Sequence, residues 1–262
     1  MLKEIKERMP KTYDTYFEPF FGGGAVFFTI HPEKAVINDC NVQLMNLYKT
    51  IKNVPVTRFV SMMTEYQAEY NSLTTEEERA AYYYAKRNAL NGFVKNGICS
   101  FDSACLFLFV NKVAFNGLYR ENKQGLINSS FSKKKRVTLF EEENIFESAK
   151  ALQNCKIMTG DYKNALSSVK AGDFVFFDSP YYETYTRYNK GGFSTEEHIR
   201  LAEIFRDLTE RNVYCMLTNS NTDYMKDLYK EYNVDVVNVT RCVNSNSNDR
   251  RGTEIIVTNY KK

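Results

Sequence analysis

The chain has 262 residues and a net charge of +3, so it is only mildly basic and any nucleic-acid surface must be local. Its length suits one substantial α/β core with an inserted or appended subdomain. Six cysteines without a Cys-x-x-Cys pair and only two histidines argue against a metal site and a disulfide framework, and the absence of a long apolar run or signal region predicts an intracellular, cytoplasmic protein that does not enter membranes.

Short strands and helices alternate over the first fifty residues, as in a mostly parallel α/β sheet. Residues 16–28 predict a strand, a turn with glycines at 22–24 and an apolar helix. Such a turn lets a ligand approach the main chain, although the glycine patterns that cradle phosphates are absent. The next strand, Ala35–Ile37, is followed by Asp39, an acid placed to accept hydrogen bonds from the hydroxyls of a ribose.

The pattern changes to helices from about residue 56 to residue 109, with helices predicted at 57–70 and 75–94. Residues 111–135 are polar with two turn signals and predict a hairpin or extended loop. The basic run at 133–136 is, taken alone, typical of a solvated face. We expect residues 55–136 to be an insertion in a sheet domain formed by residues 1–54 and 137–262.

Alternation then resumes and ends in two strands typical of an antiparallel edge. The predicted elements are a helix at 141–152, a strand at 156–159, helices at 162–169, 195–211 and 222–229, strands at 173–178 and 213–217, and the closing strands at 234–239 and 254–257. The apolar run Phe174–Phe177 is typical of a central parallel strand covered on both faces.

The segment Asp178-Ser179-Pro180-Tyr181 follows this central strand, where open α/β sheets bind ligands. The carboxylate and a backbone carbonyl can accept hydrogen bonds from an exocyclic amine, and the ring can stack on a flat base. Alone, the tetrapeptide is more typical of an ordinary proline turn. Together with the glycine turn and Asp39, it indicates a site that binds a nucleoside and an amine.

In these motifs the chain resembles the Dam-like DNA adenine-N6 methyltransferases. Residues 18–24 resemble the family's Glu-Pro-Phe-x-Gly-x-Gly turn, residues 38–41 its Asp-Ile-Asn acid, and residues 178–181 its Asp-Pro-Pro-Tyr motif. Residues 115–122 resemble its Asn-Gly-Leu-x-Arg-x-Asn recognition segment, and 217–219, 244–246 and 251–254 resemble later segments. The resemblance implies a Rossmann-like, S-adenosylmethionine-dependent enzyme with an inserted, mainly helical DNA-recognition subdomain, which flips an adenine out of double-stranded DNA.

The resemblance also implies roles for individual residues. The catalytic set is Asp178, Ser179, Pro180 and Tyr181. The set for S-adenosylmethionine is Glu18, Pro19, Phe20, Gly22, Gly24, Asp39, Asp161 and Tyr162, with Phe20 and Tyr162 on opposite faces of the cofactor adenine. The set for DNA is Phe115, Asn116, Leu118, Arg120, Asn122 and Lys134, with Arg120 reading a guanine and Lys134 meeting phosphate.

Several alternatives stay open at this level. Asp161 is equally suited to cap the next helix, and Phe20 to pack in the core. Cytosine-N4 methylation needs the same amine geometry, and a degenerate enzyme that binds DNA or a partner without turnover is a third hypothesis. GATC is the leading hypothesis for the target, and a restriction endonuclease is a candidate partner.

The chain departs from the family's pattern in three places. Ser179 replaces a proline, which keeps the backbone carbonyl but makes the turn less rigid. Residues 129–132, Ser-Ser-Phe-Ser, stand where the family often has Pro-Phe/Tyr-Gly. The family's early Gly-Gly-Lys segment is not matched, so another lysine substitutes, the cofactor binds weakly, or the sequence begins after the true start; we expect weak binding.

Overall fold

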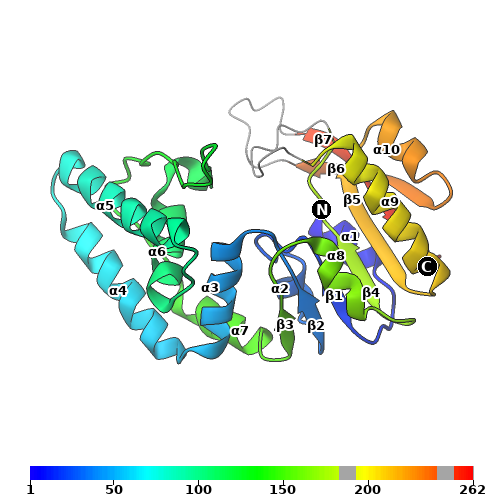
Figure 1. The fold of residues 1–262 in the computed structure, drawn as a ribbon, viewed down its shortest axis with the longest axis horizontal. Coiled ribbons are helices and arrows are strands. Elements are labelled where there is room, and N and C mark those ends of the chain that lie inside the picture. The colour runs from blue at the N-terminus through cyan, green and yellow to red at the C-terminus, as the bar shows by residue number, and fades with distance from the viewer. Residues whose placement is uncertain (183–192, 241–250, 262) are drawn as a thin grey trace. The chain divides into compact units, whose positions relative to one another are not determined.

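The computed structural model describes residues 1–182, 193–240 and 251–261 (Figure 1). The chain divides into two compact units, a sheet unit formed by residues 1–40 and 154–262 and a helical unit formed by residues 41–153. The expected insertion of residues 55–136 lies wholly within the helical unit.

The sheet unit contains a seven-stranded sheet, counted over the described residues, with the order β3-β2-β1-β4-β5-β7-β6. The first five strands along the chain pair in parallel, and β7 is antiparallel to both β5 and β6. Because β2 and β3 lie on one side of β1 and β4 on the other, the strand order reverses between β1 and β4, where such sheets bind ligands. The strands are β1 (Tyr16–Glu18), β2 (Ala35–Ile37), β3 (Cys155–Ile157), β4 (Phe174–Phe177), β5 (Tyr214–Ser220), β6 (Asn233–Thr240) and β7 (Arg251–Thr258).

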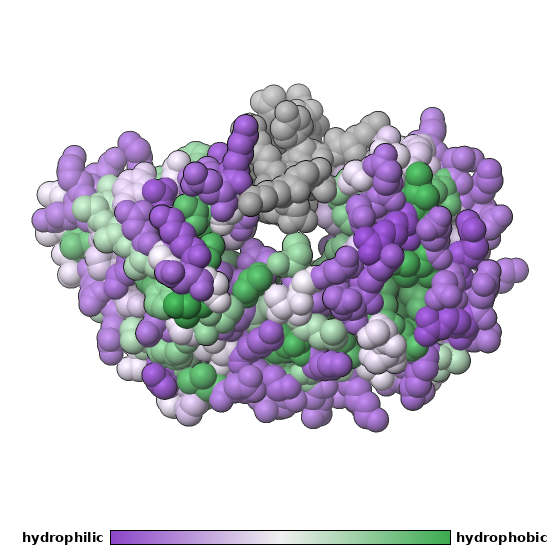
Figure 2. Space-filling model, viewed as in Figure 1, coloured by the Kyte–Doolittle hydropathy of each residue, from purple (hydrophilic) through white to green (hydrophobic). Residues whose placement is uncertain are grey.

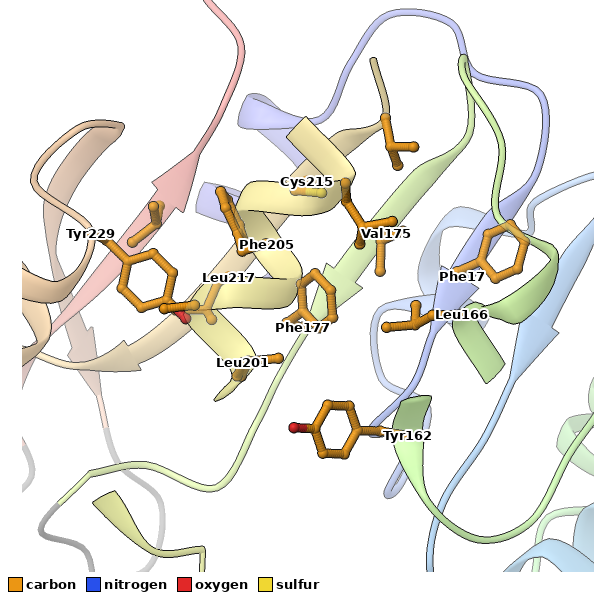
Figure 3. Close-up of a cluster of buried hydrophobic side chains, with 14 of the residues drawn as sticks. Phe17, Tyr162, Leu166, Val175, Phe177, Leu201, Phe205, Cys215, Leu217 and Tyr229 are labelled. Atoms are coloured by element: carbon orange, nitrogen blue, oxygen red, sulfur yellow. The ribbon is translucent and has the colours of Figure 1, made fainter. Parts of the chain in front are cut away.

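The central strand β4 is buried at all four positions, as its apolar run predicts. Val175 and Phe177 belong to the core cluster on one face of the sheet, together with Phe205 of α9 (Figure 3). This face is covered by α8 (Tyr162–Ala165), the 3-10 turn η2 (Leu166–Ser168), α9 (Thr195–Glu210) and α10 (Asp223–Leu228). Among the described residues, the remaining helices of the unit are α1 (Leu2–Arg8) and α2 (Phe27–Ile30).

Helix α9 shows how patterning fixes this packing. Ser194 caps its first turn by accepting a hydrogen bond from the Glu197 backbone amide at 3.3 Å. Leu201 and Phe205 are fully buried on its inner side, whereas its exposed positions are polar or charged except for Ile199. Hydrophilic side chains likewise predominate on the surface seen in Figure 2. The apolar stripe therefore holds the helix against β4 and β5.

The helical unit is built around α6, whose residues are mostly buried. Helices α3 and α7 contact each other, and α6 also contacts α3, α4 and α5. The sequence predicted helical structure up to about residue 109 but not the break before α6, where Ser100 caps the helix by accepting from Ser103. The helices are α3 (Val42–Asn53), α4 (Val56–Ser72), α5 (Glu76–Lys95), α6 (Phe101–Val113) and α7 (Glu142–Ala151), with a 3-10 turn, η1 (Phe115–Gly117).

None of the helices in 1–182, 193–240 and 251–261 combines the length and apolar character needed to cross a membrane. Within the same residues, no three His, Cys, Asp or Glu side chains are grouped so as to hold a metal ion.

Candidate functional site

Asp178 directly follows β4, and the neighbouring strand fixes its carboxylate. The Thr218 hydroxyl, on β5, donates to Asp178 Oδ1 at 2.6 Å. The Asp178 side chain is accessible to solvent, yet desolvation by the surrounding protein raises its pKa; the Thr218 hydrogen bond opposes this rise, and the charge of Glu254 adds to it. The structure thus presents an oriented hydrogen-bond acceptor at the point where the strand order reverses.

Asn219, also on β5 and fully buried, holds the rest of this loop. Its Nδ2 donates to Ser179 Oγ at 3.2 Å, and its Oδ1 accepts from the backbone amide of Tyr182 at 2.9 Å. The Ser220 hydroxyl donates to the Tyr182 carbonyl at 2.9 Å. Three successive residues of β5 therefore hold the loop that follows β4.

Tyr181 is anchored from a third strand. Its hydroxyl donates to Oε2 of Glu254, a buried residue of β7, at 3.0 Å. Burial raises the pKa of Tyr181, so the phenol keeps its proton at neutral pH. Pro180 and the Tyr181 ring are half-buried. The ring is thus oriented at its hydroxyl end while part of its surface stays accessible.

Glu18 is the last residue of β1, and only 2% of its surface is exposed. The Tyr16 hydroxyl donates to Glu18 Oε2 at 2.8 Å. Burial raises the pKa of Glu18 to about 8, the Tyr16 hydrogen bond opposes the rise, and the charge of Asp178 adds to it. Glu18 is therefore mostly protonated at neutral pH.

The glycine turn after β1 is tied to the acid after β2. The Gly22 amide donates to Asp39 Oδ2 at 2.9 Å. Gly24 has a φ of +66°, and a Cβ there would lie 2.5 Å from the Phe21 ring, so only glycine fits without movement. Beside Gly22 and Gly23, by contrast, no atom lies within 4 Å of the position of a Cβ. A ligand can therefore approach this backbone next to a half-buried carboxylate.

Asn38 connects the loops that follow three parallel strands. Its Nδ2 donates to the carbonyl oxygens of Pro19 at 3.1 Å and Gly160 at 3.0 Å, after β1 and β3 respectively. Because Asn38 is itself the residue after β2, the carboxyl ends of β1, β2 and β3 are held at one edge. Pro19 enters the site through this backbone contact.

The structure brings Phe20, Asp161 and Tyr162 together, with Phe20 packed on the core and Asp161 capping the next helix. The rings of Phe20 and Tyr162 lie 4.8 Å apart, so a base would enter between them only if they part, and Phe20 packs against the core cluster. Asp161 caps α8 by accepting from the Lys163 amide at 2.8 Å. Its other oxygen lies 3.3 Å from the Arg200 guanidinium.

The DNA-binding candidates lie in the helical unit, on the segment after α6 shown in green in Figure 1. This segment is a hairpin with two isolated antiparallel bridges, Ala114 with Phe131 and Glu121 with Ile127. Exposed residues include Phe115, Asn116, Arg120 and Asn122, while Leu118 is half-buried. The predicted hairpin is thus present.

Two of the polar candidates also make contacts within the hairpin region. Asn122 Oδ1 accepts from the amides of Gln124 at 2.9 Å and Leu126 at 3.1 Å, which closes the hairpin tip. Lys134 is exposed, and its Nζ lies 3.4 Å from the Lys112 carbonyl. Residues 244–246, which resemble a family segment, lie outside the described residues.

Some contacts were not predicted from the sequence. One is the anchoring of Tyr181 by Glu254. The others anchor the second arm of the hairpin to α5: Tyr83 and Arg87 donate to the Ser129 carbonyl, and Asn91 bonds the backbone of Ile127. The second set had a visible signal, because these residues recur every four positions along α5 and so share one face. The first had none, because it depends on how β7 pairs with β5.

The open α/β sheet, with a glycine turn after its first strand, an acid after its second and an antiparallel last strand, fits the fold of the S-adenosylmethionine-dependent methyltransferases. The sequence model of the D12 class N6 adenine-specific DNA methyltransferases matches residues 1–243, and the chain belongs to this family. The predicted fold and the predicted activity, methyl transfer to adenine N6 in DNA, are confirmed, and the family implies S-adenosylmethionine as the methyl donor.

Curated relatives cover nearly the whole chain. The type II methyltransferase M1.LlaDCHI of Lactococcus lactis subsp. cremoris is 35% identical, over 99% of this chain and 91% of its own length. The type II methyltransferase M.MjaIII of Methanocaldococcus jannaschii is also 35% identical, over 99% and 95%. The DNA adenine methylase of Escherichia coli K12 is 29% identical, over 100% and 91%.

Proposed function

We propose that residues 178–181 bind the N6 amine of an adenine extruded from duplex DNA. Asp178 and the carbonyl of Ser179 accept the two N6 hydrogens, which draws the nitrogen lone pair out of conjugation with the ring and directs it at the methyl group. When bound, S-adenosylmethionine supplies that methyl group on a positively charged sulfur. The protein contributes position and electrostatics.

Tyr181 stacks on the extruded adenine in this proposal. Extrusion costs a few kcal/mol, and stacking on an aromatic ring returns roughly 1–3 kcal/mol per base. The hydrogen bond from Tyr181 to Glu254 supports the assignment because it orients the ring before the base arrives. Pro180 stiffens the chain between Ser179, whose carbonyl contacts the amine, and Tyr181, whose ring stacks on the base.

The cofactor lies, we propose, along the carboxyl ends of β1, β2 and β3. Asp39 accepts from the ribose hydroxyls, and the open side of Gly22 admits the ligand. Asp161 accepts from the cofactor's adenine amine. Phe20 and Tyr162 contact the faces of the adenine after their rings part. Glu18, Pro19 and Gly24 serve through the backbone of the turn, since the Glu18 side chain is buried.

Residues 55–136 act as the target-recognition subdomain. Arg120 reads a guanine through two hydrogen bonds, and Leu118 contacts a thymine methyl group. Phe115 or Asn116 fills the gap left by the extruded adenine. Asn122 and Lys134 bind the backbone of the DNA. The exposure of Phe115, 54% for a large aromatic side chain, supports this assignment.

The observation that carries the catalytic proposal is a pair of hydrogen bonds from β5 to the loop after β4, from Thr218 to Asp178 and from Asn219 to Ser179. The test uses the full chain, tritium-labelled S-adenosylmethionine and a mixed-sequence duplex DNA digested to nucleosides. Label in N6-methyladenine is expected. Label in N4-methylcytosine would show that cytosine is the substrate, and DNA binding without transfer of label would indicate a binding module.

We also propose GATC as the target sequence and a restriction endonuclease as a partner. Residues 115–122 support GATC as the target, which sequencing of the methylated sites checks directly. The type II names of two relatives support a restriction endonuclease with the same target. Such a partner would cleave unmodified DNA and spare DNA methylated by this chain.

A further inference from the structure

The two arms of the hairpin pair unevenly. The Phe115 amide donates to the Ser130 carbonyl at 2.8 Å, and the Asn128 amide donates to the Arg120 carbonyl at 2.9 Å. Residues 116–119 therefore stand between the two paired positions of the first arm, whereas only Ser129 stands between those of the second. The first arm bulges, and it accommodates the extra residues through two successive left-handed residues, Asn116 at φ +55° and Gly117 at φ +63°.

The Ser129 side chain bridges the base of this bulge. Its hydroxyl donates to the Leu118 carbonyl at 2.8 Å and accepts from the Arg120 amide at 3.1 Å. Only 3% of Ser129 is exposed. A single hydroxyl thus replaces the missing backbone pairing on both sides of Tyr119, and it does so at the two residues proposed to contact bases.

Helix α5 fixes Ser129 in turn. The Ser129 carbonyl accepts from the Tyr83 hydroxyl at 3.0 Å and from Arg87 Nη1 at 2.9 Å. One helical turn further on, Asn91 donates to the Ile127 carbonyl at 2.9 Å and accepts from the Ile127 amide at 2.8 Å. The second arm is therefore held to a rigid helix by side chains on one of its faces.

We infer that Ser129 is a positioning residue for sequence recognition: its hydroxyl sets the spacing of Leu118 and Arg120 and thereby the selectivity at both base positions. The inference rests on the proposed function of these two residues. It also gives a role to the Ser-Ser-Phe-Ser segment, where the chain departs from the pattern of the Dam-like family. Ser129 itself is buried and is not proposed to contact DNA.

The experiment compares Ser129→Ala with Arg120→Ala in the full chain. Each variant methylates a mixed-sequence duplex library, and the modified sites are sequenced. Arg120→Ala is expected to relax one base position. Ser129→Ala is expected to relax the two positions assigned to Leu118 and Arg120, each by about tenfold, because it shifts both contacts. Ser129→Thr keeps the hydroxyl and should restore the selectivity. Ser72→Ala is the matched control, since Ser72 also donates to a backbone carbonyl, that of Glu69, but is exposed and distant in sequence.

Circular dichroism shows whether Ser129→Ala is folded. Asn91→Ala loosens the same hairpin arm from α5 without removing the Ser129 hydroxyl, and it should relax the same two base positions. The inference is overturned if Ser129→Ala is folded and keeps the wild-type motif, or if Ser129→Thr is as unselective as Ser129→Ala. If Arg120→Ala leaves the methylated motif unchanged, the proposed reading of a base by Arg120 is wrong, and the inference about Ser129 loses its basis. Wild-type protein without any sequence preference would overturn both.

Discussion

The loop after β4 and the hairpin after α6 are both held by polar side chains, but different kinds of element supply them. The loop is held by β5, because the parallel register that pairs Phe177 with Leu217 places Asp178 beside Thr218. The hairpin is held by α5, whose side chains reach an arm that has few ladder bonds of its own. The position of the proposed catalytic loop follows from strand pairing, and that of the hairpin from individual side chains.

The two units also differ in the ionisable side chains that they bury. The acidic residues buried among the described residues, Glu18, Asp173 and Glu254, all lie in the sheet unit, whereas the buried arginine, Arg79, lies in the helical unit. One of them, Glu254, raises the pKa of Asp178 in the loop, and Asp178 in turn raises the pKa of Glu18. Changes in the sheet unit should therefore alter rate and pH dependence, and changes in the hairpin should alter selectivity.

Asp178→Ala carries the largest expected effect. It removes a group proposed to act on the amine in the transition state, so the rate of methyl transfer should fall by about 10²–10³ or more. DNA affinity should change little, because the recognition candidates lie in the other unit. Single-turnover transfer of tritium and a DNA-binding titration measure the two quantities.

The matched control for that variant is Asp223→Ala, a fully exposed aspartate that pairs with Lys226 on α10. It should methylate at the wild-type rate. Turnover by Asp178→Ala within a few-fold of wild type would remove Asp178 from the mechanism. Loss of DNA binding in the same variant would instead break the division of roles between the two regions.

Glu18→Gln should change how stability depends on pH. Glu18 keeps its proton to about pH 8 in the folded protein but loses it near pH 4.5 when unfolded, so the free energy of unfolding falls as pH rises between these values. Gln cannot ionise and can still accept from Tyr16. At pH 8 the variant should be more stable than wild type by a few kcal/mol, since a tenfold change in an ionisation constant corresponds to about 1.4 kcal/mol.

Denaturant unfolding at pH 5 and pH 8 measures this difference. Glu210→Gln changes an exposed glutamate of α9 and should keep the wild-type pH dependence. An equal pH dependence in wild type and Glu18→Gln would show that Glu18 is ionised in the folded protein at neutral pH.

Arg120→Ala tests whether the hairpin determines sequence selectivity. Loss of a two-bond contact to guanine should cost about 1–3 kcal/mol against the cognate base at one position, with little change in the rate on the best site. Lys134→Ala is the companion variant: it should weaken binding to all sequences alike and flatten the salt dependence. Identical motifs for wild type and Arg120→Ala would reduce Arg120 to a contact with the DNA backbone.

The sequence predicted much of the sheet unit, because its signals are local. A wholly apolar run of four residues at 174–177 predicted a central strand, and β4 is buried throughout. The antiparallel edge formed by β6 and β7 was predicted as well. Burial of Glu18 was not, because every residue of the three-residue strand β1 is buried and no alternation marks an outer face.

The contacts that hold the loops were predicted least well. Residues 217–219 were matched to a family segment, but which of Thr218 and Asn219 contacts Asp178 and which contacts Ser179 depends on the register of β4 and β5. The bulge opposite Ser129 depends on an uneven count of residues between the two arms, which no local pattern records. Such contacts arise only once distant segments are paired.

Ser179→Pro carries the smallest expected effect and tests how strictly strand β5 controls the loop. Proline keeps the carbonyl proposed to accept from the amine, so methyl transfer should stay within a few-fold of wild type. It removes the hydroxyl that accepts from Asn219, and loss of one hydrogen bond should lower the free energy of unfolding by about 1 kcal/mol. Ser179→Ala removes the same bond without adding a ring, and it should match Ser179→Pro in stability and in rate. If Ser179→Pro alone loses activity, the ring has displaced the carbonyl, and the hydrogen bond from Asn219 is not what holds it in place.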